Sequence, residues 1–207
     1  MIIYAKVFIK HVPISIFLLK IHLDMSIFKK NKAFFIFLAK FALSYLLFSG
    51  IYWLYLNQYD AAKFEPDGMT RLVAEQSAGF SKILGEDVYI KQRTKEASFK
   101  FYVNNKAVAR VVEGCNAVSV MILFTAFIVA FSTTFKRTFL YIITGIAIIH
   151  FLNVVRVGLL GLGFYYYYDY RELMHDILFP VFIYGVVFVL WVLWVTKFSG
   201  NAAKIQN

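Results

Sequence analysis

The sequence predicts an all-α integral membrane protein, a helical bundle of about four transmembrane helices that carries a small external α+β cap. Hydrophobic residues make up 60% of the 207 positions, 16% are charged, and the mean hydropathy is +0.65. These values lie far outside the usual range for a soluble domain. Four apolar runs each have about the 20 residues that cross a bilayer. A longer and more polar segment between the first two runs predicts the cap.

The amino-terminal segment, residues 1–32, is basic and is expected to be cytoplasmic. Met25 begins MSIFKKNKAFFIF, a short basic stretch that leads into an apolar run, so residues 1–24 are interpreted as an upstream extension with no role in the fold. A signal peptide is the alternative, although no small-residue cleavage site follows the short apolar run at residues 14–19.

The expected membrane helices run over residues 33–56, 115–135, 139–164 and 177–198. Tyrosine and tryptophan side chains lie near their ends, as aromatic belts do at membrane surfaces. The last three helices form the expected catalytic core, residues 115–198, and residues 199–207 form a cytoplasmic tail.

The distribution of basic residues predicts the orientation. Six bases and one acid precede the first run, two bases separate the second run from the third, and two lie at the end of the chain. Residues 57–114 instead hold nine bases and eight acids. By the positive-inside rule both termini are cytoplasmic, and residues 57–114 and the loop after the third run are external.

The external segment, residues 57–114, is expected to form a helix-plus-hairpin cap on the outer membrane surface. Apolar residues at helical spacing predict a helix over residues 71–84, with Thr70 as its N-cap and Gly85 as its stop. Short strands are predicted at residues 88–90, 99–103 and 108–112, the last two joined by a turn at Asn104 and Asn105. A purely structural cap is the alternative to a cap that takes part in function.

Charge and cysteine content exclude several classes of protein. The net charge is +10, but no basic helix or aromatic and basic face accompanies it, so a nucleic-acid partner is not expected. A single cysteine excludes an internal disulfide, and C-x-x-C motifs are absent. We therefore expect no metal site and no cofactor.

Cys115 is the candidate nucleophile. It stands in VVEGCNAVSVMILF, where a charged segment stops and the second apolar run begins. The predicted topology places this position at the external mouth of a membrane helix. Glu113 would oppose thiolate formation if it were close, so its carboxylate is expected to point elsewhere.

Arg156, in FLNVVRVGLLGLG, is expected about 12 Å inward from the external end of the third run. An intramembrane arginine costs on the order of 2.5 to 3.5 kcal/mol, so it is usually paired or functional. Asn153 shares its helix face and can orient the guanidinium; snorkelling to the headgroups is the alternative. Three nearby glycines allow a helix or a substrate backbone to come close, or serve ordinary helix packing: Gly158, Gly161 and Gly163.

His175, in RELMHDILFPVFIYG, opens the fourth run on the external side and can move protons, although a headgroup contact is the alternative. His150 lies deeper and is expected to be a buried histidine bonded to a neighbouring helix. Cys115, Arg156 and His175 are thus expected at the external ends of three consecutive runs, where thiolate, guanidinium and imidazole can together perform acyl transfer. Three residues are expected to bind substrate or orient these groups: Asn116, Asn153 and Asp176.

At these residues the chain resembles the exosortase and archaeosortase family of membrane cysteine transpeptidases, most closely the short exosortase F-type proteins of Bacteroidetes. The resemblance covers roughly residues 111–185 and rests on EGCNAVSV, NVVRVG and HDILFP, in that order. It implies Cys115 as the nucleophile, Arg156 as the stabiliser of the oxyanion or thiolate, and His175 as the acid-base residue. Many members have Cys-Ser-Gly where this chain has Cys115-Asn116-Ala117.

The resemblance implies an enzyme of the bacterial inner membrane that cleaves C-terminal sorting signals of exported proteins at the periplasmic face, through a thioester. Such a signal consists of a short motif, a transmembrane helix and a basic tail. An amine or glycan acceptor, or water, would resolve the thioester, and no cofactor would be needed. The alternative is a non-catalytic scaffold or accessory subunit of a secretion or polysaccharide-export system. A small-solute transporter is a third option, disfavoured because the polar residues cluster at one face.

Overall fold

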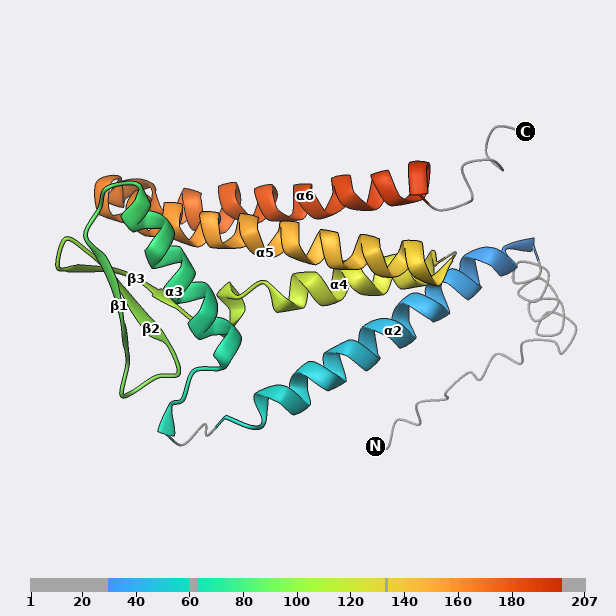
Figure 1. Cartoon of the computed structure of the whole chain (residues 1–207), viewed down its shortest axis with the longest axis horizontal. Helices are drawn as coiled ribbons and strands as arrows, with labels where there is room; N and C mark the ends of the chain where they lie inside the picture. The colour runs from blue at the N-terminus through green and yellow to red at the C-terminus, as the bar shows by residue number, and fades with distance from the viewer. Residues whose placement is uncertain (1–29, 60–62, 133, 199–207) are drawn as a thin grey trace, which may run out of the picture. The chain divides into compact units, whose positions relative to one another are not determined.

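The computed structural model describes residues 30–59, 63–132 and 134–198. The chain divides into two compact units, Met1–Ala39 and Lys40–Asn207. Helix α2 (Lys32–Leu56) begins in the first unit and continues into the second, which holds all the helices and strands that follow (Figure 1). The expected extension, residues 1–24, and the expected tail, residues 199–207, lie outside the described residues.

Within the described residues, three helices are long and apolar enough to cross a membrane: α2, α5 (Phe135–Tyr166), and the helix Leu173–Phe198, whose central part is α6 (Phe179–Leu193). The second expected run, residues 115–135, contains only α4 (Val118–Ala130), with 13 residues. At 1.5 Å per residue α4 is about 20 Å long, shorter than the ~30 Å hydrocarbon core of a bilayer. The expected class, a helical membrane protein with a small cap, is confirmed.

Helices α4, α5 and α6 pack around one apolar core. Gly145 of α5 allows the closest approach, because a Cβ atom built there would lie 2.2 Å from the ring of Phe124 of α4. At the far end the Tyr141 hydroxyl donates to the carbonyl of Leu190, 2.6 Å away, which ties α5 to α6. The buried members of the core are Ala117, Met121, Phe124, Ile128, Ile149, Ile183, Val187, Leu190 and Trp194.

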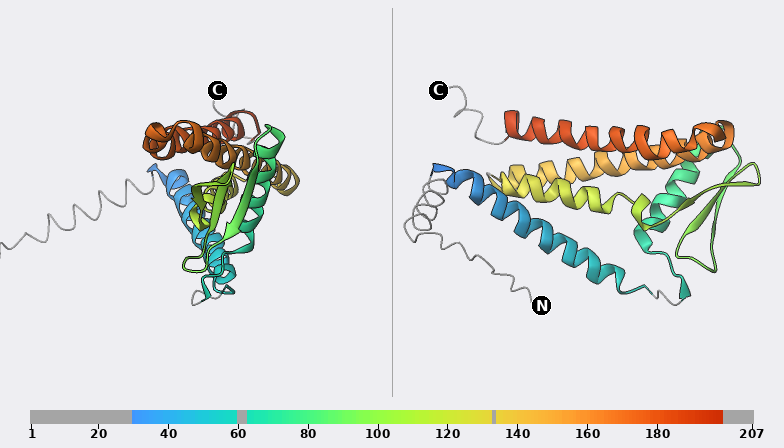
Figure 2. Two further views of the ribbon diagram at one scale, coloured as in Figure 1. Left: turned by 90° about the vertical axis from the view of Figure 1, so that its left-hand side faces the viewer. Right: turned by 180° about the vertical axis from the view of Figure 1, so that it is seen from behind.

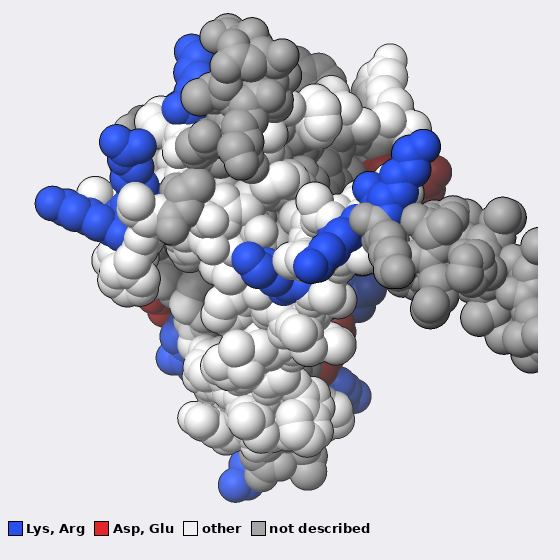
Figure 3. All heavy atoms as spheres, turned by 90° about the vertical axis from the view of Figure 1, so that its right-hand side faces the viewer, with Lys and Arg blue, Asp and Glu red and all other residues white. Residues whose placement is uncertain are grey.

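The end of the bundle where α5 begins and α6 ends is basic. Lys136 and Arg137 lie in the first turn of α5, which has no acidic residue, and Lys197 lies in the last turn of the segment after α6. Figure 3 looks onto this end, where blue basic side chains stand out and acidic ones show only behind them. This arrangement matches the charge asymmetry on which the expected orientation rests.

The cap consists of α3 (Gly68–Ile83) and a sheet of three antiparallel strands in the order β1 (Val88–Gln92), β2 (Phe99–Val103), β3 (Lys106–Val111). The predicted turn is present, with φ of 48° at Asn104 and 65° at Asn105, and Gly85 ends the helix at φ 96°. The predicted N-cap was wrong. The cap residue is Asp67, whose carboxylate accepts a hydrogen bond from the Thr70 amide at 2.9 Å, so α3 starts three residues before the predicted helix.

The cap packs against the second half of α5. The Ser77 hydroxyl of α3 donates to the carbonyl of Val154 at 3.0 Å, and Gln76 bonds His150 at 2.7 Å. Figure 2 shows the sheet and α3 together at one end of helices α4, α5 and α6. We call this end of the bundle the cap side. His150 is bonded to a neighbouring helix as expected, and that helix belongs to the cap, but His150 is half-buried and not buried as predicted.

The glycines of α5 serve this packing. A Cβ atom at Gly158 would lie 2.8 Å from Phe80 of α3, and one at Gly161 would lie 2.5 Å from Phe101 of β2. Gly163 faces Met174 in the same way, at 2.8 Å from its sulfur. Of the two readings of these glycines, the structure therefore supports packing between elements of the chain.

The contacts with the cap extend along α5 past Arg156. Phe135 and Arg156 are about 32 Å apart along the axis of α5, which is close to the full thickness of a hydrocarbon core. The helix continues beyond Arg156 to Tyr166, in contact with the cap. Arg156 therefore lies on the part of α5 that the cap contacts, and its expected depth of about 12 Å in the membrane stays a prediction.

Candidate active site

Cys115 lies on a short 3-10 turn, Glu113–Cys115, between β3 and α4. Its amide donates to the carbonyl of Val112 at 2.8 Å, and its free thiol is half-buried. The predicted helix begins only at Val118, because Ala117 adopts a left-handed conformation with φ 61°. The nucleophile candidate is therefore held by a turn at the mouth of α4, and not by the helix itself.

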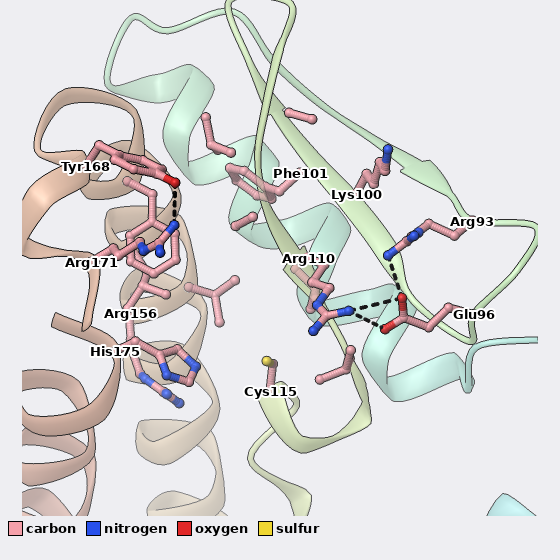
Figure 4. A pocket seen from close by; sticks show the side chains of 18 residues that line it. Arg93, Glu96, Lys100, Phe101, Arg110, Cys115, Arg156, Tyr168, Arg171 and His175 are labelled. Atoms are coloured by element: carbon pink, nitrogen blue, oxygen red, sulfur yellow. Dashed lines mark hydrogen bonds and ion pairs between the residues drawn. The ribbon is translucent and has the colours of Figure 1, made fainter. Parts of the chain in front are cut away.

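Cys115, Arg156 and His175 line one pocket of about 670 Å³. They come from three elements: the turn before α4, the middle of α5, and the π-helical segment Leu173–Leu178 that precedes α6. Figure 4 shows the Cys115 sulfur facing into the pocket from the side opposite Arg156 and His175. The remaining wall is formed by the sheet strands with their connecting loops, by α5 and by the segment that follows α5. It consists of Arg93, Glu96, Lys100, Phe101, Ala107, Val108, Ala109, Arg110, Val111, Val112, Val157, Leu160, Phe164, Tyr168 and Arg171.

The Arg156 guanidinium brings an uncompensated positive charge to this pocket. Its Nη1 donates to the Asn153 side-chain oxygen at 3.3 Å, while its Nε is buried with no hydrogen-bond partner. Across the described ranges no carboxylate lies within ion-pair distance of Arg156. A buried donor without a partner is uncommon, and it leaves the group free to bind an anion that enters the pocket.

Asn153 connects Arg156 to the nucleophile. It is fully buried, its amide nitrogen donates to the carbonyl of Cys115 at 2.8 Å, and its oxygen accepts from Arg156. One side chain thus fixes the backbone of the Cys115 turn and the direction of the guanidinium. This geometry agrees with the orienting role expected for Asn153.

His175 is exposed and is oriented by its neighbour in sequence. Its Nδ1 lies 2.6 Å from a carboxylate oxygen of Asp176, which leaves Nε2 for another partner. Pro180 follows at the start of α6 and lacks an amide hydrogen, which accompanies the π-helical winding around His175. In the described part of the chain no hydrogen bond joins His175 to the Cys115 sulfur. Such bonds often form only when substrate is bound.

Asn116 does not line the pocket, and its expected role in binding substrate or orienting the other groups stays a prediction. It is buried, with its oxygen accepting from the amide of Val118 at 2.9 Å and its nitrogen donating to Tyr52 at 2.9 Å and Thr70 at 3.2 Å. These bonds engage both polar atoms of the Asn116 side chain outside the pocket. Its role is to hold the turn between α2, α3 and α4.

Three residues support the turn although the sequence did not predict this role for them: Tyr52, Thr70 and Asp67. The Tyr52 hydroxyl accepts from Asn116 and donates to Glu113 at 2.9 Å, and Glu113 does not line the Cys115 pocket. Thr70 bonds both Asn116 and the buried carboxylate of Asp67. Their spacing along the chain carries no signal, because they meet only through packing.

The pocket wall is also more basic than expected. Five cations and one acid line it: Arg93, Lys100, Arg110, Arg156 and Arg171, with Glu96. Glu96 binds Arg93 at 2.5 Å and Arg110 at 3.1 Å, so it offsets part of this charge. Arg171 lies over the ring of Tyr168, 4.6 Å from its centroid. Apart from Arg156 on α5, the charged groups lie on the hairpin and after α5. Most of the other side chains that line the pocket are apolar.

A helical membrane bundle that places a thiol, a guanidinium and an imidazole around one pocket defines a class: an integral membrane protein with a candidate active site at a cysteine. The family model of the transmembrane exosortases matches residues 32–197. The chain therefore belongs to the transmembrane exosortase family, whose members are in general membrane cysteine transpeptidases or proteases. No curated protein and no solved structure matches the chain.

Proposed function

We propose that this protein is an exosortase F-type enzyme, of the kind found in Bacteroidetes, that cleaves the C-terminal sorting signals of exported proteins. The reaction would take place at the periplasmic face of the inner membrane. The observation that carries the proposal is the meeting of Cys115, Arg156 and His175 at one pocket, where Arg156 has no ion-pair partner among the residues that the structure describes.

In the first half of the reaction, the Cys115 thiol gives its proton to His175 and its sulfur attacks the scissile carbonyl carbon. The carbonyl electrons move to the oxygen, and the unpaired donors of Arg156 stabilise the oxyanion. The carbon–nitrogen bond then breaks, and His175 returns the proton to the leaving amine. The transmembrane helix and basic tail of the substrate leave, and the exported part remains on Cys115 as a thioester.

In the second half, an acceptor amine, a glycan hydroxyl or water attacks the thioester carbonyl while His175 takes the acceptor's proton. Collapse of the tetrahedral adduct expels the Cys115 sulfur, which regains its proton from His175. The product is an amide, an ester or a free acid, according to the acceptor. Every proton and electron pair is accounted for by these three side chains, so this scheme requires no cofactor.

The pocket wall supports a peptide substrate that approaches from the membrane. Apolar side chains near Cys115 can hold substrate side chains, among them Phe101, Val111 and Leu160. The bilayer would hold the substrate helix beside the bundle, so its external motif meets the pocket without diffusing through water. Confinement of this kind lowers the entropic cost of bringing the reacting groups together.

The test is mass spectrometry of the enzyme co-expressed with a candidate substrate that carries a C-terminal helix and basic tail. A substrate fragment linked to Cys115 as a thioester, sensitive to hydroxylamine, is the expected result. Cys115→Ala should abolish cleavage and His175→Ala should nearly do so. His150→Ala is the matched control, since His150 bonds Gln76 and does not line the pocket. If Cys115→Ala still processed the substrate fully, the proposed enzyme activity would be refuted, and the non-catalytic scaffold would remain as the function of this protein.

Orientation is tested separately, with a membrane-impermeant maleimide on intact spheroplasts. Cys115 should react without permeabilisation, because its thiol opens onto a pocket on the cap side. Labelling that occurs only after permeabilisation would contradict the periplasmic placement.

A further inference from the structure

A second hollow, of about 340 Å³, lies on the hairpin of the cap next to the Cys115 pocket. Its cations are Lys91, Arg93, Lys95 and Lys100, and in the described structure no acidic side chain lines it. Arg93 is paired with Glu96, outside the hollow. The three lysines have no ion-pair partner among the described residues, so the hollow carries a net positive charge.

The lysines are held in an arrangement that is unfavourable without an anion. Lys91 of β1 and Lys100 of β2 are direct cross-strand partners in the sheet. Like charges directly opposite one another destabilise a strand pair. Lys95 adds a third charge from the loop between the two strands. A bound anion would remove this repulsion, so the charge pattern points to an anionic ligand.

The position of the hollow indicates where the anion comes from. Phe99, at the start of β2, lies under the guanidinium of Arg71, 5.7 Å from its ring centroid. Arg71 is in the first turns of α3, and the neighbouring Met69 amide donates to the Tyr55 hydroxyl at the end of α2 at 3.2 Å. These contacts connect strand β2, which carries Lys100 of the hollow, to the end of α2, where tyrosine side chains lie as they do at membrane surfaces.

We propose that this hollow binds the phosphate of anionic phospholipid headgroups and anchors the cap to the bilayer surface. Lysine ammonium groups near a membrane attract anionic lipids, and a phosphate can accept hydrogen bonds from several of them at once. This site is separate from the proposed peptide cleavage and does not depend on it.

A headgroup bound in the hollow would also contact residues that are linked to the wall of the Cys115 pocket. Glu96 joins Arg93, which lines both cavities, to Arg110 of β3. Strand β3 leads directly into the turn that carries Cys115. A headgroup bound in the hollow would therefore steady the strand that positions the nucleophile.

The experiment measures lipid retention by the full-length protein in detergent, using native mass spectrometry with phosphatidylglycerol or phosphatidylcholine as the probe. The test variant is K91Q/K95Q, because both lysines are exposed and neither lines the Cys115 pocket. The matched control is K82Q/K106Q, which removes two cations at the opposite end of the cap. The parent and the control should prefer phosphatidylglycerol, and K91Q/K95Q should bind it about thirtyfold more weakly.

Three results would overturn the proposal: equal retention of the two lipids by the parent, unchanged retention of phosphatidylglycerol in K91Q/K95Q, or the same loss in K82Q/K106Q. A competition arm uses inorganic phosphate at the same concentration as the lipid. Complete displacement of phosphatidylglycerol would assign the hollow to a free anion and refute the lipid anchor. Because retention is read without any substrate, its failure is distinct from a failure of the cleavage reaction.

Discussion

The substitution Arg156→Lys tests whether the guanidinium takes part in the reaction or only supplies charge. In the structure one end of the guanidinium donates to Asn153 at 3.3 Å and Nε is buried without a partner. Lysine keeps the charge but has no planar fork that can bind Asn153 and an oxyanion together. Loss of a well-placed oxyanion donor slows chemistry by on the order of a hundredfold, or about 2.7 kcal/mol in activation free energy.

The assay is the ratio of processed to unprocessed substrate on a blot over time, normalised to the amount of enzyme. Arg137→Lys is the matched control, because it makes the same change on the exposed first turn of α5. We expect Arg156→Lys to be slower by about two orders of magnitude at normal abundance, and Arg137→Lys to match the parent. Processing at the parental rate by Arg156→Lys would refute the oxyanion role and leave charge balance as its only function.

Three further predictions concern the support of the site. Tyr52→Phe removes a hydroxyl that bonds Asn116 and Glu113. It should lower the free energy of unfolding by about 1 to 3 kcal/mol and change the alkylation rate of the Cys115 thiol. An unchanged alkylation rate would show that Tyr52 does not support the turn that carries Cys115. Gly161→Ala should destabilise by about 1 to 3 kcal/mol because its Cβ would lie 2.5 Å from a buried ring, whereas Gly79→Ala, with nothing within 4 Å, should not. Hydrogen bonds from Tyr166 and Asn104 hold the pKa of Glu86 below its ordinary value of 4.5. Its stabilising effect is therefore present above that value and lost as the pH falls through the lower folded-state pKa, and Glu86→Gln should show a smaller loss of melting temperature over this range.

The sequence by itself determined the elements whose causes are local. Long apolar runs predict membrane helices because a bilayer requires about 20 apolar residues for each crossing, and α2 and α5 agree with the prediction. Strand β2 matches its predicted residues, and its side chains alternate between buried and partly buried positions. The turn at Asn104 and Asn105 follows because asparagine tolerates positive φ, and Gly85 ends α3 for a similar reason.

Tertiary packing decided the features that join distant parts of the chain. Helix α4 starts at Val118 and not at Cys115, because Asn116 is bonded to α2 and α3 and Ala117 is left-handed. The cap covers the second half of α5, on which Arg156 lies, because Ser77, Phe80 and Phe101 pack against that helix. The basic wall of the pocket comes from a hairpin whose charges look, along the chain, like those of any solvated loop. Spacing and hydropathy act over a few residues, whereas these contacts join positions 38 to 77 residues apart, so only the packed structure could assign them.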